Sequence, residues 1–144
     1  MEIKHYCRIT VNSSIQMESF ARSAVAAFCA VLNPTLEEIN DIKTAVSEAV
    51  NNCVVHAYAR GAGEIYIEVV LFVGGVQITV RDQGCGFDNV TEAMQPFYTS
   101  KPNEERSGMG FTLMQAFMNE VEVTSKLGEG TCVVMRKQIG HAHA

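Results

Sequence analysis

The chain has 144 residues, 47% of them hydrophobic, with 11 basic against 16 acidic side chains and a formal net charge of −5. This length suits a single domain, spanning residues 1–144, and the acidic balance without a basic cluster argues against nucleic-acid binding. No apolar run approaches 18 residues and the N-terminus is polar, so we expect no membrane span, no signal peptide and a cytoplasmic location.

The five cysteines are an odd number, and none of them forms a CxxC pair. Most lie within apolar segments, which is typical of reduced core thiols. We therefore expect free cysteines, and we expect neither disulfides nor a zinc site.

The first third of the chain predicts a strand over residues 4–11 and a helix over residues 15–32 that carries Arg22. Arg22 fits a solvated side chain, but arginine is also a frequent anchor for a protein partner. Asn33 and Pro34 end this helix, and Thr35 with Glu38 forms a capping box that starts the next one. The second helix is predicted to run to about residue 58.

This second helix places polar side chains at every fourth position, Glu48, Asn52 and His56. At about 100° per residue they form a narrow stripe beside the apolar face of the helix. The stripe fits the solvated edge of an ordinary amphipathic helix, and it equally fits the polar flank of a site. For His56 we expect a structural role in packing or capping.

Alternation of period 2 predicts two strands over residues 64–73 and 76–82, joined at Gly74 and Gly75. Residues 83–107 lack regular periodicity apart from a short helix near 90–94. A helix over 110–118 and two strands over 121–126 and 131–137 follow, and the tail, residues 139–144, is predicted to be disordered. This order predicts an α+β two-layer sandwich, in which helices cover one face of a mixed, mostly antiparallel sheet.

The segment RDQGCGFD places Asp82 at the end of a strand, before Gly84 and Gly86. Glycine is needed where the backbone must approach a ligand closely. A carboxylate in this position can accept a hydrogen bond from an exocyclic amine such as that of adenine. The same DxGxG pattern also occurs in ordinary turns.

A second glycine pair opens the helix near residue 110, where free backbone N–H groups can bind an anion. Hydroxyl and cationic side chains, which can donate to phosphate oxygens, stand just upstream. The candidate phosphate-binding residues are Thr99, Ser100, Lys101, Arg106, Ser107, Gly108, Met109 and Gly110.

Taken together, these segments indicate a binding site for a nucleoside triphosphate. The carbonyl oxygen of Asn52 can ligate Mg²⁺, which prefers oxygen ligands. One turn earlier, Glu48 can accept a proton from an attacking hydroxyl group. The chain has no Walker A sequence, which excludes the P-loop class.

The ordered motifs ExxxN from Glu48, DxGxG from Asp82, GxG from Gly108 and a terminal Gly130-Thr131 resemble the Bergerat-fold ATPases, the group of gyrase and the histidine kinases. The segments SFAR, VAAF, SEAV and RSGMGF further resemble stand-alone anti-sigma serine kinases of spore-forming bacteria. A sensor kinase would need a preceding helix pair and gyrase a following domain, for which we expect no room.

The resemblance implies a role for each matching position. It makes Glu48 the general base, Asn52 the Mg²⁺ ligand and Asp82 the reader of adenine, supported by Thr131. Gly84 and Gly86 would line the base pocket, Gly108 and Gly110 the phosphate site, and residues 95–107 would form the ATP lid with Arg106 reaching the terminal phosphate. Ser107 replaces a glycine found in many relatives, which leaves its phosphate contact open.

The resemblance also implies an ATP-dependent protein serine kinase that uses ATP and Mg²⁺, releases ADP and acts as a homodimer. Such a protein binds a sporulation sigma factor to block transcription, and it phosphorylates a serine of an anti-anti-sigma protein. Arg22 would belong to the surface that binds these partners. The alternative is a binding module in which ATP and ADP switch partner affinity with little or no kinase activity.

Overall fold

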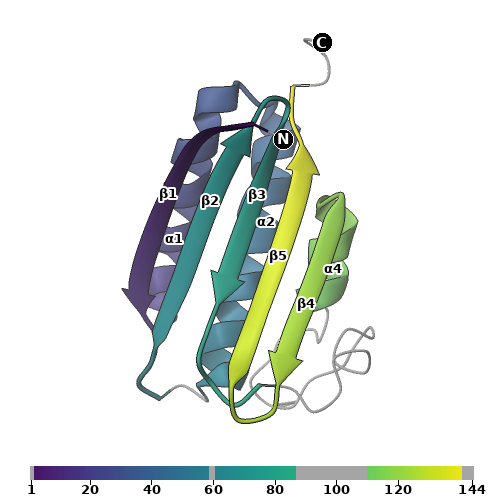
Figure 1. Ribbon diagram of the computed structural model, residues 1–144. Coiled ribbons are helices and arrows are strands. Elements are labelled where there is room, and N and C mark those ends of the chain that lie inside the picture. Colours follow the sequence, from purple (N-terminus) through teal and green to yellow (C-terminus); the bar gives the residue numbers. More distant parts are fainter. Residues whose placement is uncertain (1, 59–60, 87–109, 141–144) are drawn as a thin grey trace.

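A five-stranded sheet carries the fold, and the computed structural model describes it through residues 2–58, 61–86 and 110–140 (Figure 1). The order of the strands across the sheet is β1, β2, β3, β5 and β4. Their bounds in that order are Ile3–Asn12, Glu64–Phe72, Gly75–Arg81, Gly130–Gln138 and Glu120–Lys126.

All four pairings between these strands are antiparallel, so the prediction of a mixed sheet is wrong in that detail. Two helices in succession carry the chain away and back between β1 and β2, which makes those strands antiparallel. The strand β5 turns back from β4 through a glycine hairpin and pairs on its other side with β3. The α+β class with one helical layer is confirmed.

The helices lie on one face of the sheet, behind it in Figure 1. They are α1 (Gln16–Cys29), extended by the 3₁₀ turn η1 (Ala30–Leu32), then α2 (Leu36–Asn52) and α4 (Gly110–Phe117). In the described residues, no helix is long and apolar enough to cross a membrane.

The capping box at the start of α2 is confirmed. The backbone N–H of Glu38 donates to Thr35 Oγ1 at 3.1 Å, and the Thr35 N–H donates back to Glu38 Oε1 at 2.8 Å. Two backbone donors that α2 would otherwise leave without partners are thereby bonded. This pair fixes the residue at which α2 begins.

The far end of α2 differs from the prediction. The α-helix ends at Asn52, and residues Cys53–Ala57 form a π-helix, η2, closed by the Tyr58 N–H donating to Cys53 O at 3.1 Å. A π-helical turn contains more residues than an α-helical one. His56 therefore does not continue the stripe of Glu48 and Asn52 as an unbroken α-helix would have placed it.

The core lies between the helices and the inner face of the sheet. The inward residues of β2 are Ile65, Ile67, Val69 and Leu71, all buried as the alternating pattern predicts. The core reaches past β5, since Ile139 is 2% exposed and its N–H donates to Gly74 O at 2.9 Å. The predicted disordered tail therefore does not begin at residue 139, and residues 141–144 lie outside the described ranges.

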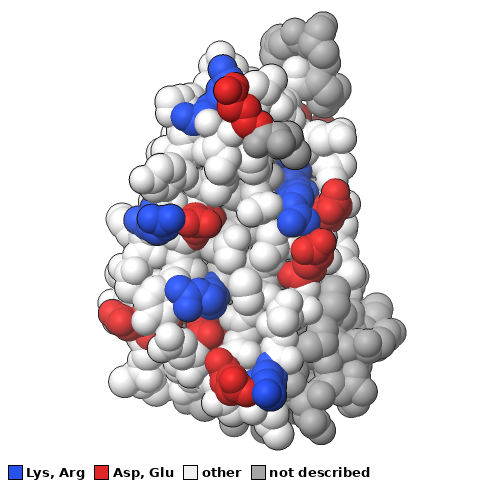
Figure 2. Space-filling view, viewed as in Figure 1, with Lys and Arg blue, Asp and Glu red and all other residues white. Residues whose placement is uncertain are grey.

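The outer face of the sheet carries oppositely charged side chains next to one another, among uncharged ones (Figure 2). Arg8 Nε lies 2.7 Å from Glu68 Oε2 across β1 and β2, and Arg136 lies 3.2 Å from both Glu120 and Glu122. The alternation of apolar and polar residues along the strands predicts that one face of the sheet is buried and the other is exposed. All five cysteines are free, as expected.

Candidate functional site

Asp82 is buried at the end of β3, with 6% of its surface exposed. Its Oδ1 accepts two backbone hydrogen bonds, from Gly84 N at 2.9 Å and from Thr131 N at 3.2 Å, and its own N–H donates to Thr131 O at 2.9 Å. Burial raises the pKa of the Asp82 carboxyl group, against the opposing effect of its hydrogen bonds. In the described residues both backbone donors to this carboxylate bond Oδ1, which leaves Oδ2 placed to accept from a ligand.

The loop after Asp82 can pass this close to its neighbours because of its glycines. Gly86 has φ +70°, and a Cβ on it would collide with the carbonyl oxygen of Lys126. Gly130 has φ +100°, and a Cβ there would collide with the carbonyl oxygen of Asp82 itself. The spacing of Gly130 in the sequence indicates only a hairpin turn. In the structure Gly130 also lets β5 pass close to the backbone of Asp82.

A pocket opens beside Asp82, between the helical layer and the sheet. Its walls come from α2, η2, β3 with the loop after it, α4 and β5. The lining residues are Ala49, Asn52, Cys53, His56, Ala57, Val80, Asp82, Cys85, Gly86, Phe111, Thr131 and Val133. An apolar pocket with few polar groups suits a flat, partly polar ring, and Asp82 and Thr131 supply the directional contacts.

Asn52 brings a polar side chain to the same pocket from the last residue of α2. Its Nδ2 atom is buried, and among the described residues it has no hydrogen-bond partner. A buried amide without a partner is costly, so its amide end is available to a ligand.

Glu48 and Asn52 both face the first residue of α4. A Cβ built on Gly110 would lie 3.3 Å from Asn52 Oδ1 and 3.6 Å from Glu48 Oε2. Because Gly110 has no side chain, the first residue of α4 can pack closely against both of these side chains. The structure therefore brings together Glu48, Asn52 and Gly110, as the sequence predicts.

Arg22 lies on the other side of Glu48, in a groove between α1 and α2 that both residues line. Its guanidinium lies 3.8 Å from Glu18 Oε1 and donates to Ser47 Oγ at 3.4 Å and to Ser19 Oγ at 3.3 Å. About a third of the Arg22 side chain is exposed. The groove thus connects an accessible cation with the carboxylate that faces Gly110.

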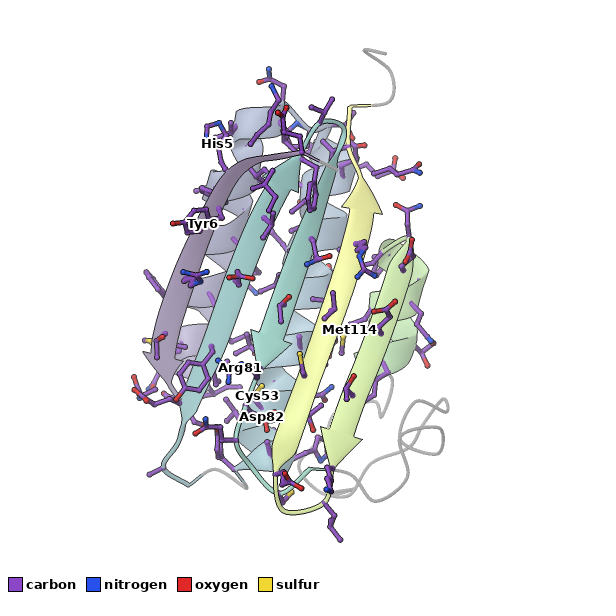
Figure 3. The ribbon with its side chains drawn as sticks, viewed as in Figure 1. His5, Tyr6, Cys53, Arg81, Asp82 and Met114 are labelled. Atoms are coloured by element: carbon purple, nitrogen blue, oxygen red, sulfur yellow. The ribbon has the colours of Figure 1, made fainter. Side chains whose placement is uncertain are left out.

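Three contributors to the site were missed from the sequence. The Tyr58 hydroxyl accepts from Gln83 N at 2.7 Å and donates to Glu64 O at 2.6 Å, which ties the loop after Asp82 to β2. Ser125 Oγ lies 2.7 Å from Thr131 Oγ1. Cys53 Sγ lies 3.5 Å from Asp82 Oδ2 (Figure 3). The contacts of Tyr58 with Gln83 and of Cys53 with Asp82 join segments 25 and 29 residues apart, and no local pattern marks them.

His56 is 6% exposed and lines the pocket, and its carbonyl oxygen accepts from the Cys85 thiol at 3.2 Å. This burial agrees with the expected packing role. The remaining predicted residues lie outside the described ranges, as does the predicted lid over residues 95–107. They are Thr99, Ser100, Lys101, Arg106, Ser107, Gly108 and Met109.

The described residues fit a nucleotide with a divalent cation. The pocket offers a carboxylate for a base edge at one end, and at the other the side chain of Asn52 meets the N-terminus of α4. A carboxamide oxygen is a ligand that Mg²⁺ accepts, and a helix N-terminus suits phosphate oxygens. No group of three or more His, Cys, Asp or Glu side chains in the described residues forms a metal cage.

Comparison with known proteins agrees with this class. A family model described as a histidine kinase-like ATPase domain matches residues 12–137. The proteins named Anti-sigma F factor from Caldanaerobacter subterraneus and from Thermoanaerobacter pseudethanolicus are 52% and 51% identical to this chain over 140 residues, covering 97% of it and 98% of each relative. The Anti-sigma F factor of Bacillus cereus is 52% identical over 130 residues, 90% of this chain and 89% of the relative.

The chain therefore belongs to the histidine kinase-like ATPase domain family, and within that family it belongs with the anti-sigma F factors. Membership implies nucleotide binding and an ATP-using activity, in agreement with the pocket beside Asp82.

Proposed function

We propose that this chain is an ATP-dependent protein serine kinase that also binds a sigma factor and blocks transcription. The name of its relatives supports the sigma-factor role. The kinase role depends on one observation, the convergence of the Glu48 carboxylate and the Asn52 side-chain amide on the start of α4 at Gly110. A carboxylate and a carboxamide at a helix N-terminus are the groups that a phosphoryl transfer needs in one place.

In this proposal each side chain has a distinct task. Glu48 accepts the proton of the serine hydroxyl group of the partner, and Asn52 holds Mg²⁺ through its carbonyl oxygen. Asp82 accepts from the exocyclic amine of adenine, and Thr131 with Gly84 holds Asp82 in place. Bound Mg-ATP supplies the phosphoryl group and the charge neutralisation. Phosphoryl transfer depends mainly on such positioning and electrostatics.

The proposed phosphate contacts include Gly110 and the upstream residues predicted from the sequence. Gly86, which lines the pocket, is proposed to contact the adenine base. In the predicted lid, the proposed donors to phosphate are Thr99, Ser100, Lys101, Arg106, Ser107, Gly108 and Met109.

The proposed partners are a sigma factor and an anti-anti-sigma protein that becomes phosphorylated on a serine, with the kinase acting as a homodimer in the cytoplasm. Arg22 is the proposed anchor for both partners. Support comes from its position in the α1–α2 groove beside Glu48, where a docked chain would bring a hydroxyl group towards the carboxylate.

The Glu48→Gln variant tests the kinase proposal. We expect ATP affinity close to that of the wild type, while phosphorylation of the partner falls by at least about 10², the usual value of general-base assistance. The measurement is incubation with Mg-ATP and a candidate anti-anti-sigma protein, followed by mass spectrometry for phosphoserine and calorimetry for ATP binding. Glu37→Gln, the same change at an exposed position in the first turn of α2, is the control.

Two outcomes would redirect the proposal. Unchanged phosphotransfer in Glu48→Gln removes Glu48 from the role of base. A wild-type protein that binds ATP and both partners but leaves no phosphoserine favours the alternative, a binding module whose partner affinity is switched by ATP and ADP.

A further inference from the structure

Asp82 has a third donor besides the two backbone amides, the thiol of Cys53. Cys53 is the first residue of η2 and is 3% exposed, and its Sγ lies 3.5 Å from Asp82 Oδ2. Both backbone donors, Gly84 N and Thr131 N, use Oδ1. The two carboxylate oxygens therefore have different surroundings, and the thiol is the donor that the described residues give to Oδ2.

The thiol keeps its proton, so it is the donor in this contact. Burial and the neighbouring Asp82 carboxylate raise the pKa of Cys53 well above its ordinary value. The hydrogen bond from Cys53 in turn lowers the pKa of Asp82, against the larger effect of burial. A thiol is a weak donor, but its acceptor here carries charge, and hydrogen bonds to charged groups are the stronger ones.

Because Asp82 Oδ2 already accepts from the Cys53 thiol, a second donor can approach this oxygen only from a restricted range of directions. Cys53 and Asp82 both line the pocket, and Figure 3 shows them next to each other below the end of β3. A fixed, ionised Oδ2 accepts from an amine but repels a carbonyl oxygen. A carboxyl group that takes up a proton can instead donate to a carbonyl oxygen, so it would distinguish an exocyclic amine from an exocyclic carbonyl group less sharply.

We propose that Cys53 is a positioning residue that holds Asp82 Oδ2 as an acceptor, and so sets the preference for a purine with an exocyclic amine over one with an exocyclic carbonyl. This inference depends on the proposed reading of the base by Asp82. It gives the first residue of the π-helix a role in nucleotide selection, separate from the packing of the surrounding core.

The test compares binding of ADP and of inosine diphosphate, whose base carries a carbonyl group in place of the amine. Both are titrated by calorimetry, with Mg²⁺, into the wild type, Cys53→Ala, Cys53→Val and Cys53→Ser. Alanine is smaller than cysteine and valine is larger, and neither can donate, whereas serine keeps a donor. Cys29→Ala is the matched control, because Cys29 is a 1% exposed thiol at the end of α1 that does not line the pocket.

We expect the wild type to prefer ADP. Cys53→Ala and Cys53→Val should each lose roughly threefold to tenfold in ADP affinity, the usual range for one hydrogen bond, with a smaller change for inosine diphosphate. Cys53→Ser should keep the preference, and Cys29→Ala should leave both affinities unchanged. Loss of packing alone would lower the melting temperature of a variant without changing the ratio of the two affinities.

An unchanged ratio in both Cys53→Ala and Cys53→Val overturns the inference, as does a serine variant that behaves like them. Asp82→Asn, titrated in parallel, separates this failure from that of the proposed function. If Asp82→Asn binds ADP as the wild type does, the base is not read at Asp82 and the proposed function fails at that point. If Asp82→Asn loses ADP while the Cys53 variants do not, only the role of Cys53 is wrong.

Discussion

Four polar or charged residues are buried in the described residues, and three of them, His56, Asp82 and Thr131, line one pocket. The fourth, Glu38, closes the capping box of α2. Burial of a polar group is unfavourable unless it is hydrogen-bonded, so a concentration of such groups marks a site. The buried polar residues of the pocket thus lower the stability of the fold at the place where they are available to contact a ligand.

Asp82→Asn should make the nucleotide-free protein more stable at pH 7. Burial raises the pKa of Asp82 in the folded state, so the stability that its protonated form contributes is present below the unfolded pKa and is lost as pH rises through the folded pKa. Asparagine cannot ionise and avoids that loss. We expect its melting temperature to exceed that of the wild type by a few degrees at pH 7, and the difference to shrink as pH falls towards 4.

Thermal unfolding followed by circular dichroism across this pH range measures the effect, with ADP absent. A lower melting temperature for Asp82→Asn at every pH would show that the bonds from Gly84 and Thr131 to the carboxylate outweigh the effect of burial. The same variant should bind ADP more weakly, since it can present a donor to the adenine amine.

At the scale of elements, Lys137 joins three of them. Its Nζ lies 3.2 Å from Asp41 Oδ2 on α2 and donates to Phe117 O, at the end of α4, at 2.7 Å. The two side chains are 12% and 20% exposed, so solvent screens the pair only partly. The bond from β5 holds the C-terminal end of the helix whose first residue, Gly110, faces Glu48 and Asn52.

Lys137→Met should destabilise the protein by about 2 kcal/mol, because it leaves a half-buried carboxylate and a helix-end carbonyl without their donor. Thermal or urea unfolding measures this change. Arg8→Met removes the ion pair with Glu68 on the open sheet face, where the Arg8 side chain is 72% exposed, and should leave the unfolding midpoint nearly unchanged. Equal effects of the two substitutions would contradict a specific role for the Lys137 contacts.

The elements also show what local sequence can predict. Alternation in β2 and the capping pair of Thr35 and Glu38 are local signals, and both are confirmed. The end of α2 is different, since Cys53, Val54, Val55 and His56 are all buried and a uniformly buried segment has no polar face from which to read its period. The position of β5 between β3 and β4 depends on pairing between distant residues, which no local pattern encodes.

The candidate site divides in the same way. Asp82 and Asn52 were predictable because a carboxylate before DxGxG glycines and a carboxamide on a helix flank are readable in the sequence. The contacts of Cys53 and Tyr58 were not, because they become apparent only when η2 is placed beside the loop after β3. The first kind of residue would touch the ligand, and the second kind holds the first in position.

At the scale of the whole molecule, the outer face of the sheet carries paired charges (Figure 2). The pocket lies between the helices and the sheet, and the α1–α2 groove lies in the helical layer. Glu48 lines the groove and also faces Gly110 beside the pocket. In the described part of the chain, the groove and the pocket share no lining residue. Nucleotide affinity and partner affinity should be separable by mutation.

Arg22→Glu tests this separation. Reversal of an anchoring charge commonly lowers affinity by about tenfold or more. If Arg22 is the proposed anchor, binding of the two proposed partners, the sigma factor and the anti-anti-sigma protein, should weaken by at least that factor, while ADP affinity stays unchanged. Arg8→Glu, the same reversal on the open sheet face, should bind both partners normally. Surface plasmon resonance measures the partners and calorimetry the nucleotide, and normal binding of both partners to Arg22→Glu would remove Arg22 from the docking surface.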